Sequence, residues 1–321
     1  MTIGLIVPPY RHTGSNRVLW LKYSDTMRQL NDAYYFATGT EPRDQRFLQD
    51  GRVLGDGNDD EIYGNTLVQT PILRGGKPVI YLFPPSSLGH VEVSVRLVPQ
   101  WSFTHIYPIV GKTLLADGGE RITWSVSVQS DGTLVDKSGR IELSYLFWEA
   151  ASNPSADAPP SPPLSPRLTV DSIEHFNPAY PSLAPDSPTA VLLPSGRELL
   201  QYLDTTLRSL TLHTSARNDF ITYWLPALEK HPFVALRFLP QGAYERAAEL
   251  SINSPERKPD VVTRVFMLFR GLNAEEAGAP IWSAARERAG KMNWAEIVGV
   301  APSAMNPEMF RVLEWGAMEV L

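Results

Sequence analysis

Alternation between apolar and polar positions is the clearest pattern in the first half of the chain. The segments HVEVSVRLVP and RITWSVSVQ, residues 90–99 and 121–129, carry an apolar residue at every second position. A period of two places these side chains on one face of a strand. A turn signal, Asp131-Gly132, follows the second segment. The pattern predicts an antiparallel sheet or sandwich over residues 75–150.

Two acids fall in phase with apolar positions of predicted strands. The first ends the segment IELSYLFWE, in which one strand face would hold Ile141, Leu143, Tyr145, Phe147 and Glu149. The second is Glu314, which alternates in phase with Phe310 and Val312 in FRVLEWG. An ionised acid in such a stripe is costly unless it is paired, hydrogen-bonded or protonated. Both acids are therefore candidate site residues.

The pattern changes to helical spacing after residue 190. SGRELLQYLDTTLRSLTL opens with Ser195 and Glu198 at the spacing of a capping box, which predicts a helix start. The apolar positions at helical spacing are Leu199, Leu203, Leu207 and Leu210. A second helix is predicted over residues 215–230, and Pro226 is expected to bend or end it.

The rest of the second half mixes strands and helices. VALRFLP, VVTRVFMLF and AEIVGV are predicted to be strands, and QGAYERAAEL and SAARERAGK are predicted to be helices. VVTRVFMLF is nearly all apolar, which is typical of a central strand. We expect the terminal FRVLEWG strand to join the same sheet.

These patterns predict an α+β protein with an antiparallel β-sandwich-like N-terminal half, followed by a mixed helix and strand half. Residues 1–70 form an irregular N-terminal extension, and residues 71–152 form an antiparallel β domain. Residues 153–190, rich in proline, form a linker or a surface loop. Residues 191–321 form an α+β domain.

Composition limits the partners and the compartment. The net charge of −6 disfavours nucleic acid and anionic membranes as partners. No window approaches the 18 or so apolar residues that span a bilayer. The absence of cysteine excludes disulfides and a thiol nucleophile, and the N-terminus lacks the basic region of a signal peptide. We therefore expect a cytoplasmic protein, and the sequence indicates no oligomeric state.

Local signatures of common catalytic sites are missing. There is no HExxH, no GxSxG, and no phosphate or dinucleotide loop, so we expect no metal and no cofactor. The segment DGNDDEIYGN has part of the calcium-loop spacing but carries Glu61 at the glycine position, which favours a solvated acidic turn. His213 is expected to cap a helix, and Asp131 to build a hairpin turn.

Carboxylates beside aromatic residues suggest a carbohydrate site. Glycosidases use two acids, and aromatic rings stack on sugars; a lectin uses the same groups without breaking a bond. The hypothesis takes Glu149 and Glu314 as the catalytic pair. It assigns sugar binding to Trp148, Tyr223, Trp224 and Trp315. Hydrolysis requires the two carboxyl groups to lie about 5–10 Å apart across an open cleft.

Two alternatives remain open. In the first, the tryptophans belong to the core and each acid satisfies backbone groups or pairs with Arg264 or Arg311. In the second, the protein is a non-catalytic interaction protein that binds partners through its proline-rich segment.

The order of several motifs resembles a family of fungal and bacterial proteins. The motifs are KPVIYLFPP, DGTL, YLFWEA, FITYWLP, PDVVTRVFMLF and VLEWGAMEV. The resemblance covers residues 70–320, and the first 70 residues look like an addition. It implies no activity, substrate or catalytic residue.

Overall fold

The computed structural model describes residues 74–153 and 176–320, together with five short strands near the N-terminus. The chain divides into two compact units, and residues 74–152 and 176–320 belong to the second. The strands of the first unit are β1 (Thr2–Val7), β2 (Arg17–Lys22), β3 (Phe47–Gln49), β4 (Arg52–Val53) and β5 (Leu67–Gln69). β1 pairs with β2, and β3 pairs with β4 and β5. The acidic segment at residues 56–65 and most of the proline-rich segment lie outside the described residues.

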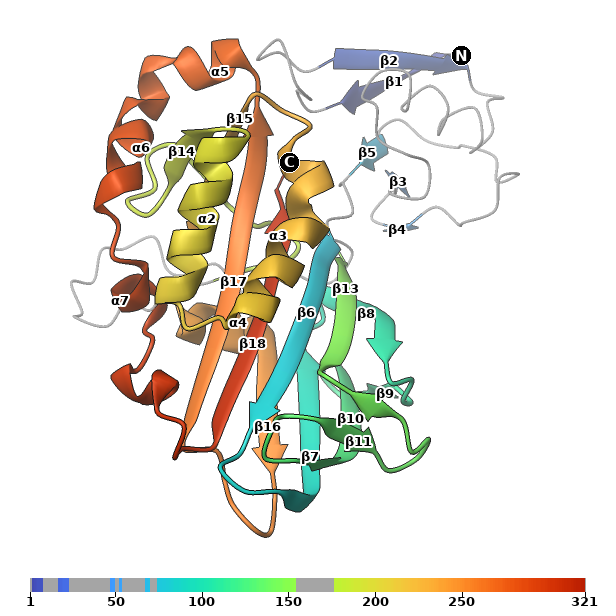
Figure 1. Ribbon diagram of the computed structural model, residues 1–321. Coiled ribbons are helices and arrows are strands. Elements are labelled where there is room, and N and C mark those ends of the chain that lie inside the picture. The colour runs from blue at the N-terminus through green and yellow to red at the C-terminus, as the bar shows by residue number, and fades with distance from the viewer. Residues whose placement is uncertain are drawn as a thin grey trace, which may run out of the picture. The chain divides into compact units, whose positions relative to one another are not determined.

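A seven-stranded sheet forms the centre of the second unit (Figure 1). In spatial order its strands are β14 (Val191–Pro194), β15 (Phe233–Phe238), β17 (Val261–Leu272), β18 (Arg311–Glu319), β6 (Arg74–Phe83), β13 (Leu146–Ser152) and β8 (Trp101–Tyr107). Every pair is antiparallel except β17 and β18, which are parallel. The prediction that FRVLEWG joins VVTRVFMLF in one sheet is confirmed. Residues 71–152 contribute three strands and residues 191–321 contribute four, so these two regions share one sheet.

A second sheet, of six strands, belongs to the same unit. Its strands are β12 (Glu142–Leu143), β11 (Leu134–Asp136), β10 (Glu120–Val128), β7 (Leu88–Leu97) and β16 (Ala248–Asn253), with β9 (Thr113–Leu114) paired to β10. The apolar positions of β7 and β10 that alternate in the sequence are buried. Two mostly antiparallel sheets with several helices confirm the predicted α+β, sandwich-like class.

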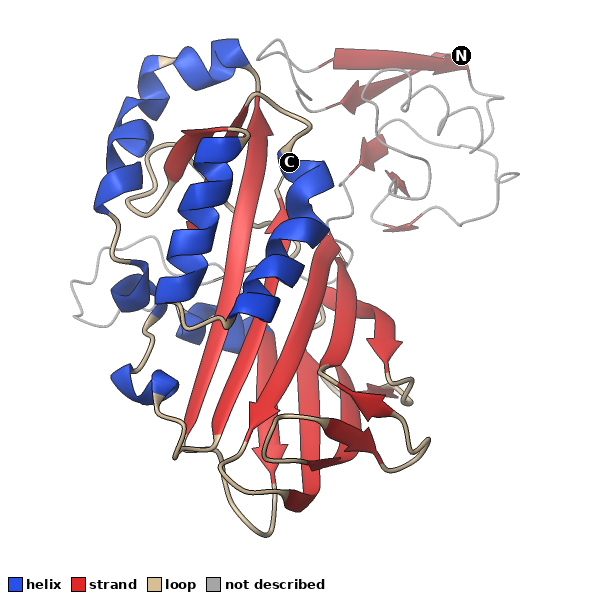
Figure 2. Ribbon diagram, in the orientation of Figure 1, coloured by secondary structure: helices blue, strands red, loops and turns tan. Residues whose placement is uncertain are grey.

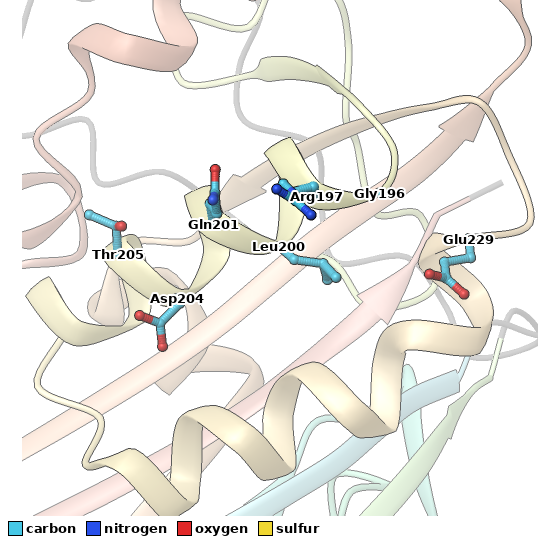
Figure 3. A pocket seen from close by; sticks show the side chains of 7 residues that line it. All are labelled: Gly196, Arg197, Leu200, Gln201, Asp204, Thr205 and Glu229. Carbon is cyan, nitrogen blue, oxygen red and sulfur yellow. The ribbon is translucent and has the colours of Figure 1, made fainter.

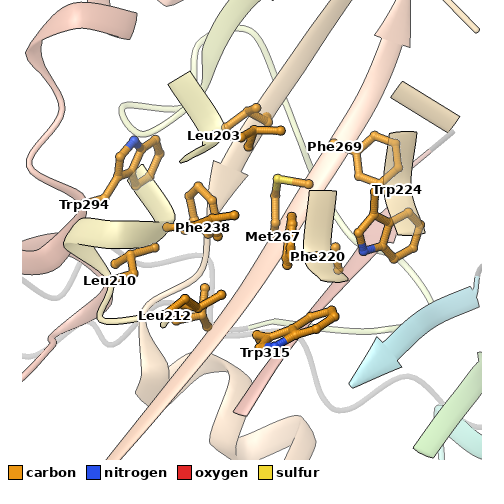
Figure 4. Packing of buried hydrophobic residues seen from close by; sticks show 14 of the residues in the cluster. Leu203, Leu210, Leu212, Phe220, Trp224, Phe238, Met267, Phe269, Trp294 and Trp315 are labelled. Atoms are coloured by element: carbon orange, nitrogen blue, oxygen red, sulfur yellow. The ribbon is translucent and has the colours of Figure 1, made fainter. Parts of the chain in front are cut away.

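Two helices, α2 (Arg197–Ser209) and α3 (Thr214–Leu228), cover one face of the seven-stranded sheet (Figure 2). The sheet buries large aromatic residues beneath them, as Figure 4 shows. The rings of Phe220 on α3 and Trp315 on β18 lie 5.2 Å apart. Trp224 packs 5.1 Å from Phe269 of β17. The face of β18 that carries Trp315 is therefore the face that α3 covers.

Shorter helices complete this unit. They are α4 (Gln241–Ala247), α5 (Ala274–Gly278), α6 (Ser283–Arg288) and α7 (Trp294–Val298), with 3₁₀ turns at Pro280–Trp282, Ala289–Lys291 and Pro302–Met305. None of the helices in the described part of the chain has the length and apolarity that a membrane span requires.

The strand predicted over residues 141–149 is divided between the two sheets. Glu142–Leu143 belongs to the six-stranded sheet, whereas β13 begins only at Leu146 in the seven-stranded sheet. The prediction of one continuous strand with a single apolar face over residues 141–149 is therefore wrong, because the chain crosses from one sheet to the other within this segment. Only its last part, with Phe147 and Glu149, lies in β13.

Two further local predictions are corrected. The capping box fails because Gly196 is the N-cap of α2, while the Ser195 hydroxyl donates to the carbonyl oxygen of His231 instead. AEIVGV forms most of helix α7 rather than a strand. The Asn293 side chain caps this helix and Gly299 ends it in a left-handed conformation with φ of 82°.

Other local predictions are confirmed. The helix predicted over residues 215–230 is present as α3, which runs through Pro226 and ends at Leu228. His213 caps α3, since its Nδ1 accepts the Ala216 N–H at 3.3 Å. The Asp131 carboxylate accepts the Thr133 N–H at 2.8 Å and so builds the hairpin turn.

Candidate functional site

Glu314 lies in the middle of the seven-stranded sheet and has no exposed surface. The indole Nε1 of Trp148 donates a hydrogen bond to Glu314 Oε1 at 3.0 Å. The guanidinium Nε of Arg264 donates to Oε2 at 2.5 Å. Both oxygens of this carboxylate are thus engaged in the interior.

Arg264 is buried with Glu314 and completes a polar network. Its Nη1 donates to a Glu245 carboxylate oxygen and to the Ala248 carbonyl oxygen, and its guanidinium carbon lies 4.3 Å from the centre of the Tyr244 ring. Burial alone would lower the pKa of Arg264, but Glu314, Tyr244 and Glu245 outweigh it and raise the pKa above its usual range. The pairing of Glu314 with Arg264, one of the alternatives from sequence, is confirmed.

Glu149 has a different environment on the face of the sheet that α3 covers. The hydroxyl of Tyr223, on α3, donates to Glu149 Oε1 at 2.7 Å. The imidazole Nδ1 of His105, on the edge strand β8, lies 3.1 Å from Oε2. The Glu149 side chain is 20% exposed and that of His105 is 65% exposed. This carboxylate is accessible from solvent, and its own neighbours fix its orientation.

The two acids do not form a pair across a cleft. Glu149 bonds to Tyr223 of α3, whereas Glu314 lies one position from Trp315, whose ring packs under α3. Successive residues of a strand point to opposite faces, so Glu314 points to the face away from α3. The sheet therefore separates the two carboxylates, and the open cleft that hydrolysis needs is not formed between them.

The aromatic candidates also separate into two groups. Trp148 and Trp315 have no exposed surface and Trp224 is 7% exposed, so a sugar ring cannot stack on them. The stacking role predicted for these tryptophans is thus corrected, and the alternative that they belong to the core is confirmed. Tyr223 is 40% exposed and is the only one of the four that a ligand can reach.

Lys77 adds a positive charge beside the Tyr223 ring. This residue lies on β6 with φ of 50°, a left-handed conformation that is uncommon for a side chain with a Cβ. Its Nζ lies 5.2 Å from the centre of the Tyr223 ring. Glu149, Tyr223, His105 and Lys77 together are called the Glu149 site below.

Sequence reasoning missed two members of this site. His105 is the cross-strand neighbour of Glu149 between β8 and β13, and this pairing is not visible in one sequence. Lys77 begins the motif KPVIYLFPP and gives no local signal of its own. Tyr223 and Glu149 are both candidates from the sequence, and the structure brings them into contact.

A shallow pocket of about 740 Å³ lies along α2, away from the Glu149 site (Figure 3). Its charged side chains are Arg197, Asp204 and Glu229, so both signs of charge are present. This mixture selects no particular ligand chemistry. Within the described ranges, no cluster of three histidine, aspartate or glutamate side chains is arranged to hold a metal ion.

The Glu149 site combines groups that suit a neutral polar ligand. It offers carboxylate oxygens as acceptors, imidazole and ammonium groups as donors, and one exposed ring. Comparison with protein-family models, with curated proteins and with solved structures finds no match for the chain.

Proposed function

We propose that the Glu149 site binds a carbohydrate and does not cleave it. The observation that carries the proposal is the partly exposed Glu149 carboxylate, which Tyr223 and His105 hold in place. The ring of Tyr223 is itself exposed beside this carboxylate. A carboxylate fixed in this way loses little conformational freedom when a ligand binds, and this favours affinity.

The chemistry of the site matches sugar hydroxyls, which both donate and accept hydrogen bonds. A carboxylate has about four acceptor positions, so Glu149 retains acceptor capacity beyond its hydrogen bond from Tyr223 and its contact with His105. The Lys77 ammonium supplies donors, and the Tyr223 ring supplies an apolar face for the C–H side of a sugar. The protein is proposed to act in the cytoplasm, consistent with its lack of cysteine.

The position of Glu314 supports binding without hydrolysis. A glycosidase needs a second carboxyl group facing the same ligand. Glu314 is fully buried in an ion pair with Arg264 and lies on the opposite face of the sheet. Glu149 therefore acts as a binding residue in this proposal.

A glycan array tests the proposal with the wild-type protein and Glu149→Gln. The substitution keeps the shape of the side chain and removes its charge, so we expect apparent affinity to fall by about tenfold or more. Glu287→Gln, at an exposed position of α6, removes the same charge elsewhere and should bind as the wild type does. Absence of binding to any glycan would overturn the proposal. Equal binding by Glu149→Gln would place the ligand at another surface.

A further inference from the structure

A second pocket, of about 380 Å³, lies where the loop before α3 meets the ends of β6 and β18. It shares no residue with the Glu149 site. Three arginines line it, Arg208, Arg217 and Arg311, and the described residues of its lining include no acid. Three threonines, at positions 211, 214 and 263, add hydroxyl groups. This is a concentration of hydrogen-bond donors and positive charge in a chain whose net charge is −6.

One carboxylate balances only part of this charge. Asp204 accepts hydrogen bonds from Arg217 Nε at 2.8 Å and from Arg208 Nη2 at 3.1 Å. Arg217 also donates to the Leu212 carbonyl oxygen, which holds its guanidinium in place. Two of the three guanidinium groups thus share Asp204, and Arg311 adds a positive charge that no ion pair among the described residues balances.

Arg311 differs from the other two arginines of the pocket. Among the described residues it forms no ion pair, and its guanidinium carbon lies 5.4 Å from the centre of the Phe83 ring. Its Nε is buried, and no acceptor in the described part of the chain bonds to it. A buried N–H of a charged group that lacks an acceptor is rare in folded proteins and calls for one.

His213 presents a second donor of this kind. Its Nδ1 accepts the Ala216 N–H, so the neutral ring carries its proton on Nε2. That Nε2 is buried and has no hydrogen-bond partner among the residues that the structure describes. Burial lowers the pKa of His213, and this outweighs the opposing effect of Asp219 on α3. The lowered pKa favours the neutral ring. The N-terminus of the 15-residue helix α3 begins at the next residue and adds partial positive charge.

We propose that this pocket binds a small organic oxyanion, a phosphate or carboxylate group attached to an apolar body. The charged oxygens lie against Arg311, Arg217 and the start of α3. The apolar body lies against Phe83, Leu212 and Met305, which also line the pocket. The volume of the pocket lies within the range of pockets that bind small organic molecules.

Titration calorimetry at low ionic strength tests the proposal with three probes: inorganic phosphate, phenyl phosphate and benzoate. We expect saturable binding of at least one of the aromatic anions, more tightly than inorganic phosphate. Comparison of phenyl phosphate with benzoate then identifies the preferred charged group. Equal affinity for inorganic phosphate and both aromatic anions would overturn the apolar part of the proposal. No saturable binding of any probe at millimolar concentration would overturn all of it.

Variants localise the binding. Arg311→Gln should weaken it by about tenfold or more, since a charged hydrogen bond is lost. Arg121→Gln, at an exposed position of β10 in the other sheet, removes the same charge and should change affinity by less than about twofold. Equal weakening by both variants would show non-specific attraction and overturn the proposal.

Two further measurements cover the case in which Arg311→Gln does not fold. Arg208→Gln alters a side chain that is 69% exposed, so the fold should tolerate it, and we expect binding to weaken by about threefold. In the wild-type protein, NMR should show the His213 ring and the first-turn amides of α3 shifting with the bound anion. Unchanged His213 signals at saturation would contradict binding in this pocket.

Discussion

Glu149 and Glu314 stand next to tryptophans in strands of the same sheet, yet their environments differ completely. Glu314 lies on the central strand β18, where both faces of the sheet are covered, and Arg264 neutralises it in the interior. Glu149 lies on β13, one strand from the sheet edge, and keeps contact with solvent. The comparison shows that the place of a strand in its sheet decides whether an acid stabilises the fold or remains available to a ligand.

Removal of the buried Arg264 cation is expected to give the largest change in the free energy of unfolding. In Arg264→Met, Glu314 remains buried without its countercharge, and we expect the free energy of unfolding to fall by about 3–5 kcal/mol. Urea denaturation followed by circular dichroism measures this change. A loss below about 1 kcal/mol would contradict the role assigned to the ion pair.

A double variant distinguishes a lost pair from a merely damaged core. Arg264→Met with Glu314→Leu removes both charges, so the remaining cost should be smaller than that of Arg264→Met alone. The same denaturation experiment provides the comparison. If the double variant is less stable than Arg264→Met, the charge of Glu314 is not the source of the loss.

The hydrogen bond from Trp148 gives an intermediate effect. Trp148→Phe removes the indole N–H that Glu314 Oε1 accepts, and we expect a loss of about 2 kcal/mol. Trp124→Phe is a matched control, because Trp124 is equally buried but donates to the backbone carbonyl of Pro108. In an Arg264→Met and Glu314→Leu background, Trp148→Phe should cost less than it does in the wild type. An unchanged cost there would contradict coupling between Trp148 and Glu314.

The smallest effect is expected at the Glu149 site. Tyr223→Phe keeps the ring and removes the hydroxyl that bonds to Glu149, and water replaces that bond because the carboxylate is partly exposed. We expect a loss below about 1 kcal/mol in the free energy of unfolding. A loss as large as that of Arg264→Met would show that Glu149 stabilises the fold as Glu314 does.

The sequence predicts those parts of the fold that depend on local periodicity. The alternation in β7 and β10 and the leucine spacing of α2 give the correct elements, because each element buries one regular face. The sequence pattern gives the wrong element where helix caps, rather than apolar periodicity, decide the local structure. AEIVGV has apolar residues suited to a strand, but the Asn293 cap and the left-handed Gly299 enclose a single helical turn.

The candidate site is less predictable, because its members meet only through tertiary structure. Glu149 and Tyr223 are recognisable as an acid and an aromatic residue, but their contact depends on how α3 packs on the sheet. Arg264 and Glu314 become neighbours because β17 and β18 are parallel and place the two residues opposite each other in register. His105 joins Glu149 by strand pairing in the same way.

The most direct test of the account compares Glu314→Gln with Glu149→Gln in equilibrium unfolding under identical conditions. Both substitutions remove one charge and keep the side-chain shape, so the comparison isolates the environment of each acid. We predict that Glu314→Gln lowers the free energy of unfolding by about 3 kcal/mol and Glu149→Gln by about 1 kcal/mol or less. Equal losses, or a larger loss for Glu149→Gln, would contradict the division between a structural and an available acid.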